Sequence, residues 1–327
     1  MSWACAQINN LLWNIPKRVI LRLKKGAGMK KEMMGIVSYI EKLVRKGGPE
    51  ESEYVELNMK LGELHQMVKL GAISEDELDS IRKAFGDAFS LNTMQGFCLA
   101  KPHGYAGDFE MIDRIYRQWL SEHPSLVRWD HFSHWQPAAK AVRNRKSYFH
   151  QLLTRMSAQH KPLNVLKLGI GPGRSMFEWL ESNPDAQVHF ECVELDPNAI
   201  SFAQQLNALH LDRVSFYKQN ALTFRPHKKY HLIWIAGLFD YFDDRVFVKV
   251  AKRMLPTIAD GGELVIGNFS LENPSRAYME TLDAWVLRHR APEMLVQLLE
   301  KAGAHPSTIT IHAEPEGINL FAHVSGG

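Results

Sequence analysis

The chain reads VLKLGIGPGRS from residue 165 to residue 175, and this stretch decides the fold. The apolar run from Val165 to Leu168 is typical of a buried parallel strand. Gly169, Gly171 and Gly173 then predict a sharp turn into a helix, because glycine accepts backbone conformations that other residues avoid and leaves N–H groups open to a ligand. The stretch therefore predicts a strand, turn and helix that cradle a nucleotide cofactor.

A second apolar run, Val188 to Val193, ends at Glu194. A carboxylate at this point can accept hydrogen bonds from both hydroxyls of a ribose. A glycine-rich turn alone is a weak sign of a ligand, since tight strand-to-helix turns need glycine in any case. A nicotinamide dehydrogenase would share both features, yet no glycine stands where such a site favours its third one, and Pro172 interrupts the turn. A dehydrogenase is therefore the weaker interpretation.

The rest of the C-terminal half alternates short apolar strands with helices. Strands are predicted over residues 214–217, 230–235 and 263–267, the last after a Gly261-Gly262 turn, and helices over 175–182, 197–206, 245–258 and 291–302. Two final strands, 308–311 and 319–324, flank a turn from Glu314 to Gly317 and predict a hairpin. This order predicts an α/β fold with a doubly wound, Rossmann-like sheet of seven strands.

The N-terminal half has a helical pattern instead. Apolar residues recur at helical intervals from residue 31 to residue 89, and Ser74 before three acidic residues predicts a capped helix. The periodicity continues over 110–120 and 138–156. We therefore predict an all-helical cap domain over residues 1–155 and a cofactor-binding domain over residues 156–327.

Composition excludes several classes of protein. The 327 residues are 45% hydrophobic and 23% charged, as in an ordinary globular protein, and the net charge of +3 is too small to indicate nucleic acid. The three cysteines show no metal-binding spacing, so we expect no metal site and a reduced, cytoplasmic setting.

Residues 1–31 form a basic segment with seven Lys or Arg and no acidic residue. The main expectation is a solvated, partly disordered leader. Peripheral contact with a membrane or an acidic carrier protein is the alternative. The segment does not fit a signal peptide, because the charges follow the apolar part and Pro16 interrupts it.

The order of strands and polar residues resembles class I S-adenosylmethionine-dependent methyltransferases. The resemblance implies that the glycine turn meets the methionine part of the cofactor, the acid after strand two holds the ribose, and the residues after strand three meet the adenine. The cofactor-binding residues it implies are Gly169, Gly171, Gly173, Glu194, Asn220, Ala221 and Ala236. One position departs from the family, since Lys167 replaces the usual acid and cannot accept the cofactor's ammonium hydrogens.

Three motifs resemble a narrower family: KPHGYAGD at 101–108, GLFDY at 237–241 and IGNF at 266–269. They are similar to motifs of bacterial methyltransferases that make 3-hydroxypalmitic acid methyl ester, the extracellular factor of quorum sensing. The similarity runs from roughly residue 90 to residue 324. It implies that the 101–108 loop closes over the cofactor, and that the acceptor is a small or fatty-acyl hydroxy acid, free or held by a carrier protein.

A carboxylate acceptor is already ionised, so it needs no general base, but it does need a positive or hydrogen-bonding anchor. The candidate anchors are Lys101, His103, Arg145 and Arg290. The candidate catalytic residues, which lie at loop ends facing the carboxyl edge of the sheet or in the 101–108 loop, are Tyr105, Asp108, Asp240, Tyr241 and Asn268. Structural roles compete with these, such as helix capping by Asp108 or Asp240.

Two other functions stay open. A closed, dry pocket without an acceptor would let the cofactor's own amine displace methylthioadenosine and form a cyclic amino acid, and Lys167 hints at such altered handling of the amino-acid end. A non-catalytic cofactor-binding regulator is the other alternative, favoured if side chains fill the acceptor cleft.

Overall fold

The computed structural model describes residues 26–327 and divides the chain into two compact units. Unit 1 comprises 1–111, 118–139 and 274–286, and unit 2 comprises 112–117, 140–273 and 287–327. The segment 274–286 lies far beyond the boundary predicted at 155/156, yet it packs within unit 1. That boundary stays a prediction. The basic segment predicted over residues 1–31 lies outside the described residues except for its last six, which begin a helix.

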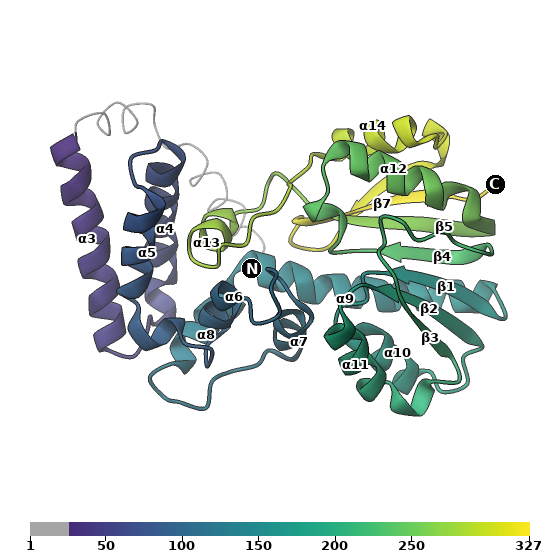
Figure 1. Cartoon of the computed structure of the whole chain (residues 1–327), viewed down its shortest axis with the longest axis horizontal. Coiled ribbons are helices and arrows are strands. Elements are labelled where there is room, and N and C mark those ends of the chain that lie inside the picture. Colours follow the sequence, from purple (N-terminus) through teal and green to yellow (C-terminus); the bar gives the residue numbers. More distant parts are fainter. Residues whose placement is uncertain (1–25) are drawn as a thin grey trace. The chain divides into compact units, whose positions relative to one another are not determined.

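Unit 2 contains a seven-stranded sheet with the order β3-β2-β1-β4-β5-β7-β6 (Figure 1). Its strands are β1 (Leu163–Leu168), β2 (Val188–Glu194), β3 (Val214–Lys218), β4 (Tyr230–Ile235), β5 (Ile258–Phe269), β6 (Ile309–Ala313) and β7 (Asn319–Ser325). Strands β1 to β5 pair in parallel, whereas β7 runs antiparallel to β5 and β6. The predicted doubly wound sheet and its final hairpin are confirmed.

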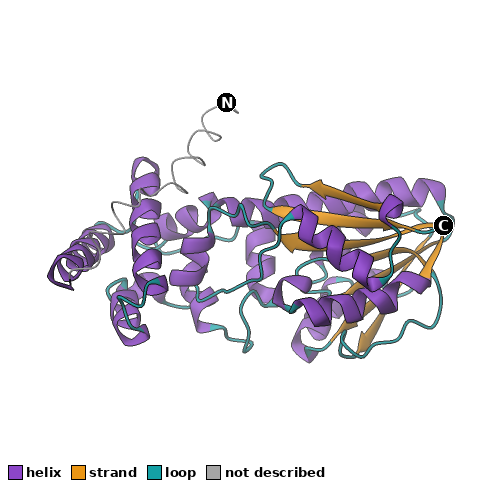
Figure 2. Ribbon diagram, turned by 90° about the horizontal axis from the view of Figure 1, so that it is seen from above, coloured by secondary structure: helices purple, strands orange, loops and turns teal. Residues whose placement is uncertain are grey.

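Helices cover both faces of this sheet (Figures 1 and 2). One face carries α9 (Pro137–Gln159), α10 (Arg174–Ser182) and α11 (Pro197–Leu206), and the other carries α12 (Asp244–Met254) and α14 (Pro292–Ala302). Side chains alternate across a strand, so Val165 packs among residues of α9 and α10 while Leu166 packs among residues of α12 and α14. Burial of each such side chain contributes roughly 1.5–3 kcal/mol. Both faces being buried explains the continuous apolar runs in the sequence.

The predicted Gly261-Gly262 turn is wrong, because both glycines lie inside β5. The register shifts there: Tyr230 pairs with Ile258, but Leu232 pairs with Glu263. The extra residues form a bulge, and Gly261 accommodates it with a φ of +68°. A glycine pair signals a turn and a bulge equally well, and the sequence alone does not show that β4 pairs on both sides of the irregularity.

The sheet order reverses between β1 and β4. Strand β1 is followed by β2 and β3 on one side, whereas β4 and β5 lie on its other side. The loops that leave the carboxyl ends of β1 and β4 therefore diverge, and the ends of two such strands are the usual ligand position in open α/β sheets.

Unit 1 is helical, as the sequence predicts for the N-terminal region. Its helices are α3 (Gly26–Arg45), α4 (Tyr54–Lys69), α5 (Glu75–Lys83), α6 (Met94–Ala100), α8 (Val127–Trp135) and α13 (Arg276–Thr281), and α7 (Phe109–Arg117) begins in it and ends in unit 2. The predicted cap of α5 is confirmed, since the Ser74 hydroxyl accepts from the N–H of Glu77 and the Ser74 N–H donates to the Glu77 carboxylate at 2.9 Å.

Helix α13 belongs to unit 1 although it follows β5 in sequence, and the sequence analysis missed it. The Tyr278 hydroxyl lies 2.7 Å from Ser133 Oγ, and the Tyr278 ring packs edge-on against Phe132. Arg82 Nε donates to the Thr281 carbonyl at 3.0 Å. A helix of six residues is too short for a hydrophobic period to be recognised.

No helix within residues 26–327 combines the length and apolar character needed to cross a membrane. The same described part of the chain holds no cluster of three or more His, Cys, Asp or Glu side chains able to bind a metal ion.

Candidate cofactor site

The three glycines between β1 and α10 all have left-handed backbone conformations, with φ of +69° at Gly169, +56° at Gly171 and +70° at Gly173. A Cβ on Gly173 would lie 2.9 Å from the Cβ of Ala203, so packing of α10 on α11 explains that glycine. A Cβ on Gly171 would meet no atom within 4 Å. The turn thus has open space beside Gly171, which suits a ligand that approaches the backbone.

Glu194 ends β2 with one carboxylate oxygen held in place. Its Oε1 accepts from the N–H of Leu195 at 2.8 Å and from the N–H of Asp196 at 3.2 Å. Within residues 26–327, nothing donates to its Oε2. This half-buried carboxylate is therefore fixed in orientation and keeps an oxygen for a ribose hydroxyl.

Asn220 follows β3, the neighbour of β2 in the sheet. Its Oδ1 accepts from the N–H of Leu222 at 2.8 Å, which fixes the loop that also carries Ala221. The predicted adenine and ribose residues therefore lie at the ends of adjacent strands, on the same edge as the glycine turn.

Lys167 is a buried cation under the glycine turn, with 5% of its surface exposed. Its Nζ donates to Ser175 Oγ in the first turn of α10 at 2.9 Å and lies 5.2 Å from the centre of the Phe149 ring. Burial lowers the pKa of Lys167 to about 8, and the charge of Arg145 contributes to this value in the same direction. A lysine in this position is neutral far more often than an exposed one.

Arg145 reaches the loop after β4 from α9. Its Nη1 lies 2.8 Å from the position of a Cβ on Gly237, whose φ is +87°. Only 6% of Arg145 is exposed, and no residue in the described part of the chain accepts a hydrogen bond from it. The guanidinium is thus a buried cation with unused donors.

Arg290 is also buried, but all five of its N–H groups are engaged. Its Nε and Nη2 donate to Asp244 Oδ1, its Nη1 donates to the Phe239 carbonyl and to Asn268 Oδ1, and its Nη2 donates to the Phe242 carbonyl. No donor is left for a substrate carboxylate, which argues against the anchor role predicted for Arg290. The side chain instead joins the loop after β4 to the end of β5.

Asn268 and Asp240 belong to the same network. The Asn268 amide donates to the carbonyls of Arg288 and Phe269, each at 2.9 Å, so its side chain is fully used. Asp240 Oδ1 accepts from the N–H of Phe269 at 2.6 Å. Burial raises the pKa of Asp240 to about 6, although this hydrogen bond and the charges of Arg145 and Arg290 act in the opposite direction.

The raised pKa of Asp240 predicts a pH dependence of stability. The folded state holds its proton up to about pH 6 while the unfolded chain loses it near pH 4, so the free energy of unfolding falls as the pH rises between these values. Between pH 4 and pH 7 the wild type should lose about 3 kcal/mol relative to Asp240→Asn. Urea unfolding at a series of pH values measures this difference, and parallel profiles for the two proteins would contradict it.

The 101–108 loop lies in unit 1, and its side chains Lys101 and His103 both have protein partners. Lys101, at a φ of +48°, donates from Nζ to the Ala284 carbonyl at 3.1 Å. His103 Nε2 lies 3.2 Å from a carboxylate oxygen of Glu110. Tyr105 is 39% exposed.

Asp108 is buried and caps α7, since its Oδ1 accepts from the N–H of Met111 at 2.8 Å. Burial raises its pKa above the usual range. The structural role weighed for Asp108 is therefore observed. The roles predicted for Lys101, His103, Tyr105 and Asp108 at the cofactor site stay predictions, as does that of Tyr241, which is 41% exposed.

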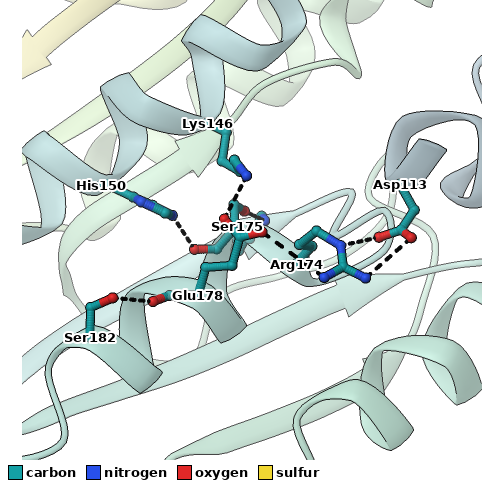
Figure 3. A network of polar contacts seen from close by, with 8 residues as sticks. Asp113, Lys146, His150, Arg174, Ser175, Glu178 and Ser182 are labelled. Carbon is teal, nitrogen blue, oxygen red and sulfur yellow. Dashed lines mark hydrogen bonds and ion pairs between the residues drawn. The ribbon is translucent and has the colours of Figure 1, made fainter. Parts of the chain in front are cut away.

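A polar network that the sequence analysis missed fixes the first turn of α10 (Figure 3). Arg174 forms a two-pronged ion pair with Asp113 of α7, with an Nη2 to Oδ2 distance of 3.2 Å. His150 Nε2 donates to the Ser175 carbonyl at 2.7 Å, and Lys146 pairs with Glu178 at 2.5 Å. The partners come from two other helices, α7 and α9, so no local pattern reveals them. Together they hold the glycine turn from its C-terminal side.

Comparisons with known proteins agree with this geometry. Residues 165–262 match a protein family described as "Methyltransferase domain". A search of proteins with curated functions gave no match.

Solved structures show likeness at low sequence identity. A possible exported protein from Bordetella parapertussis is 16% identical over 90% of this chain and 96% of its own, with a TM-score of 0.57. A putative O-methyltransferase from Nostoc punctiforme is 13% identical over 95% and 99%, with a TM-score of 0.48. The N-methyltransferase NodS from Bradyrhizobium japonicum, in complex with S-adenosyl-L-homocysteine, is 19% identical over 55% and 86%, with a TM-score of 0.40.

The family match covers the glycine turn, the acid after β2 and the loop after β4. The seven-stranded, doubly wound sheet and its final antiparallel hairpin are those that the sequence predicts. Residues 165–262 of this chain therefore match a methyltransferase domain, and the sheet of unit 2 has the methyltransferase fold.

Proposed function

We propose that the chain is an S-adenosylmethionine-dependent methyltransferase that methylates a carboxylate oxygen of a small or fatty-acyl hydroxy acid. The observation that carries the proposal is the open space beside Gly171, next to the fixed carboxylate of Glu194 at the same edge of the sheet. A nucleoside with a free ribose fits this combination, because the turn admits close approach and the carboxylate accepts hydroxyl hydrogens.

The residues that would hold the cofactor are the glycine turn, Glu194 and the loop of Asn220 and Ala221. S-adenosylmethionine, when bound, supplies an electrophilic methyl group on a sulfonium. The protein's own task is to orient the acceptor and exclude water, since an in-line displacement needs a near-attack geometry more than a proton transfer. The fully engaged side chains of Asn268 and Arg290 serve this task by fixing the loop after β4.

The binding of an anionic group near the ends of β1 and β4 is supported by the charges there. Arg145 and Lys167 are two buried cations, and Asp240 is the buried carboxyl that interacts with Arg145. Lys101 and His103 of the 101–108 loop are the anchors proposed for the acceptor itself, on the resemblance of KPHGYAGD to enzymes that esterify a hydroxy acid. A desolvated carboxylate attacks the methyl group without a general base. This agrees with the loop after β4, whose polar groups are hydrogen-bonded to other groups of the protein.

The test is a panel of acceptors with matched head groups. A long-chain 3-hydroxy acid, a short hydroxy acid, and the amide and alcohol of each are incubated with the protein and S-adenosylmethionine, and methyl esters are measured by mass spectrometry. We expect esters from the acids only, with Lys101→Met raising the KM for acids by about tenfold. Equal methylation of amides or alcohols would contradict a carboxylate acceptor.

Lys167 favours a second candidate function, the cyclisation of S-adenosylmethionine as a substrate. Its lowered pKa lets the buried amine accept a proton from a nearby ammonium group near neutral pH. A freed substrate amine would form a bond to its own γ-carbon as the carbon–sulfur bond breaks. The products would then be a cyclic amino acid and methylthioadenosine, without methyl transfer.

A further inference from the structure

Arg145 is a buried cation whose surroundings suit an anionic ligand. Its neighbours on α9 have protein partners: Asn144 donates to Glu314 at 2.8 Å, and Lys146 pairs with Glu178. Arg145 is 94% buried by comparison, and its guanidinium donates no hydrogen bond within residues 26–327, although its charge interacts with that of Asp240. Buried donors without an acceptor are costly, so such a group is kept where an anion completes its hydrogen bonds.

The guanidinium lies where the sheet order reverses. Its Nη1 and Cζ lie 2.8 Å and 3.4 Å from the position of a Cβ on Gly237, which follows β4. Strand β4 pairs with β1, where Trp234 is level with Lys167 just before the glycine turn. Gly237 leaves room for Arg145 that any side chain would fill. The donors of Arg145 therefore lie beside the carboxyl end of β4, the neighbour of β1 in the sheet.

The order of the strands indicates which anion arrives there. Along the carboxyl edge the sheet presents Asn220 after β3, Glu194 on β2, the glycine turn after β1, and then Gly237 with Arg145. The cofactor of the proposed function is a linear molecule, with its adenine and ribose at one end and its amino acid at the other. If Asn220 and Glu194 hold the nucleoside end, the amino-acid end lies between β1 and β4.

We propose that Arg145 binds the α-carboxylate of the cofactor and makes the domain selective for nucleosides that carry an intact amino-acid end. The inference rests on the proposed function in taking S-adenosylmethionine as the cofactor. It also explains how Lys167 can replace an acid: recognition of the amino-acid end shifts from its ammonium to its carboxylate. Arg145 is then a specificity residue for the cofactor, and the anchor for the acceptor lies elsewhere.

Calorimetry on the full chain tests this with three nucleosides: S-adenosylhomocysteine, decarboxylated S-adenosylmethionine, and methylthioadenosine, which has no amino-acid end. The wild type should bind the first more tightly than the others. Arg145→Met should weaken S-adenosylhomocysteine by about ten- to a hundredfold, as expected for a charge-assisted hydrogen bond, and leave methylthioadenosine unchanged. The affinity of Arg145→Lys for S-adenosylhomocysteine should lie between those of the wild type and Arg145→Met. Lys140→Met, which removes another charge from α9, is the matched control and should match the wild type.

Thermal unfolding without ligand gives a second reading. Because Arg145 donates no hydrogen bond within residues 26–327, Arg145→Met should keep or raise the melting temperature of the ligand-free protein, unlike the loss of a hydrogen-bonded buried arginine. Unchanged affinity of Arg145→Met for S-adenosylhomocysteine would overturn the inference while the proposed function stands. A raised KM for the acceptor acid with unchanged cofactor affinity would assign the guanidinium to the acceptor instead. A wild type that binds none of the three nucleosides would overturn the proposed function and this inference with it.

Discussion

Replacing Arg290 by methionine should lower the free energy of unfolding by about 3–5 kcal/mol. The change removes five hydrogen bonds and leaves the carbonyls of Phe239 and Phe242, the Asp244 carboxylate and the Asn268 side-chain oxygen without their donor. Buried acceptors without a partner keep their full desolvation cost, whereas the methionine recovers only part of it through apolar contact. Urea unfolding monitored by tryptophan fluorescence measures the loss.

Arg288→Met is the matched control, because Arg288 is exposed and stands two residues away on the same segment. A surface change of this kind should alter the free energy of unfolding by about 0.5 kcal/mol or less. If the Arg290 and Arg288 variants were equally stable, the network that joins the loop after β4 to the end of β5 would not hold the fold in solution.

Replacing Glu194 by alanine should weaken the binding of S-adenosylhomocysteine by about 10²- to 10⁴-fold. The carboxylate is oriented by the N–H groups of Leu195 and Asp196, so a ribose meets it without a cost of ordering. Two charge-assisted hydrogen bonds, each worth roughly 1.5–3 kcal/mol, would be lost. Calorimetry measures the change directly, and Glu194→Gln should lose less because it keeps one acceptor oxygen.

Asp212→Asn controls for the loss of one exposed negative charge before β3 and should leave affinity unchanged. The melting temperature of Glu194→Ala should move little, since the carboxylate is half-buried and its partners are backbone groups near solvent. If the Glu194 variant bound S-adenosylhomocysteine with wild-type affinity, the ribose would not bind at the end of β2.

The sheet could be predicted from sequence because its strands are buried on both faces. Runs such as Tyr230 to Ile235 leave no polar face, so their boundaries appear in the sequence as they do in the structure. The bulge at Gly261 and the helix α13 could not be predicted. Each depends on a partner elsewhere in the chain: the register of β4 for the first, and the packing of Tyr278 on Phe132 for the second.

The candidate site shows the same limit at the level of single side chains. The sequence analysis treated Arg145 and Arg290 alike, as cations near predicted loops. Tertiary packing separates them, since Arg290 meets acceptors for every N–H and Arg145 meets none among residues 26–327. Asp108 is a similar case. An aspartate at this position suits both a helix cap and the predicted catalytic role, so the sequence alone does not separate the two.

The central claim is that the domain transfers a methyl group, and the nucleoside it releases tests this most directly. We expect the full chain, given S-adenosylmethionine and a hydroxy acid, to form S-adenosylhomocysteine in an amount equal to the methyl ester, both measured by chromatography with mass spectrometry. Release of methylthioadenosine with a cyclic amino acid and no methyl ester would contradict methyl transfer and establish the cyclisation reaction in its place.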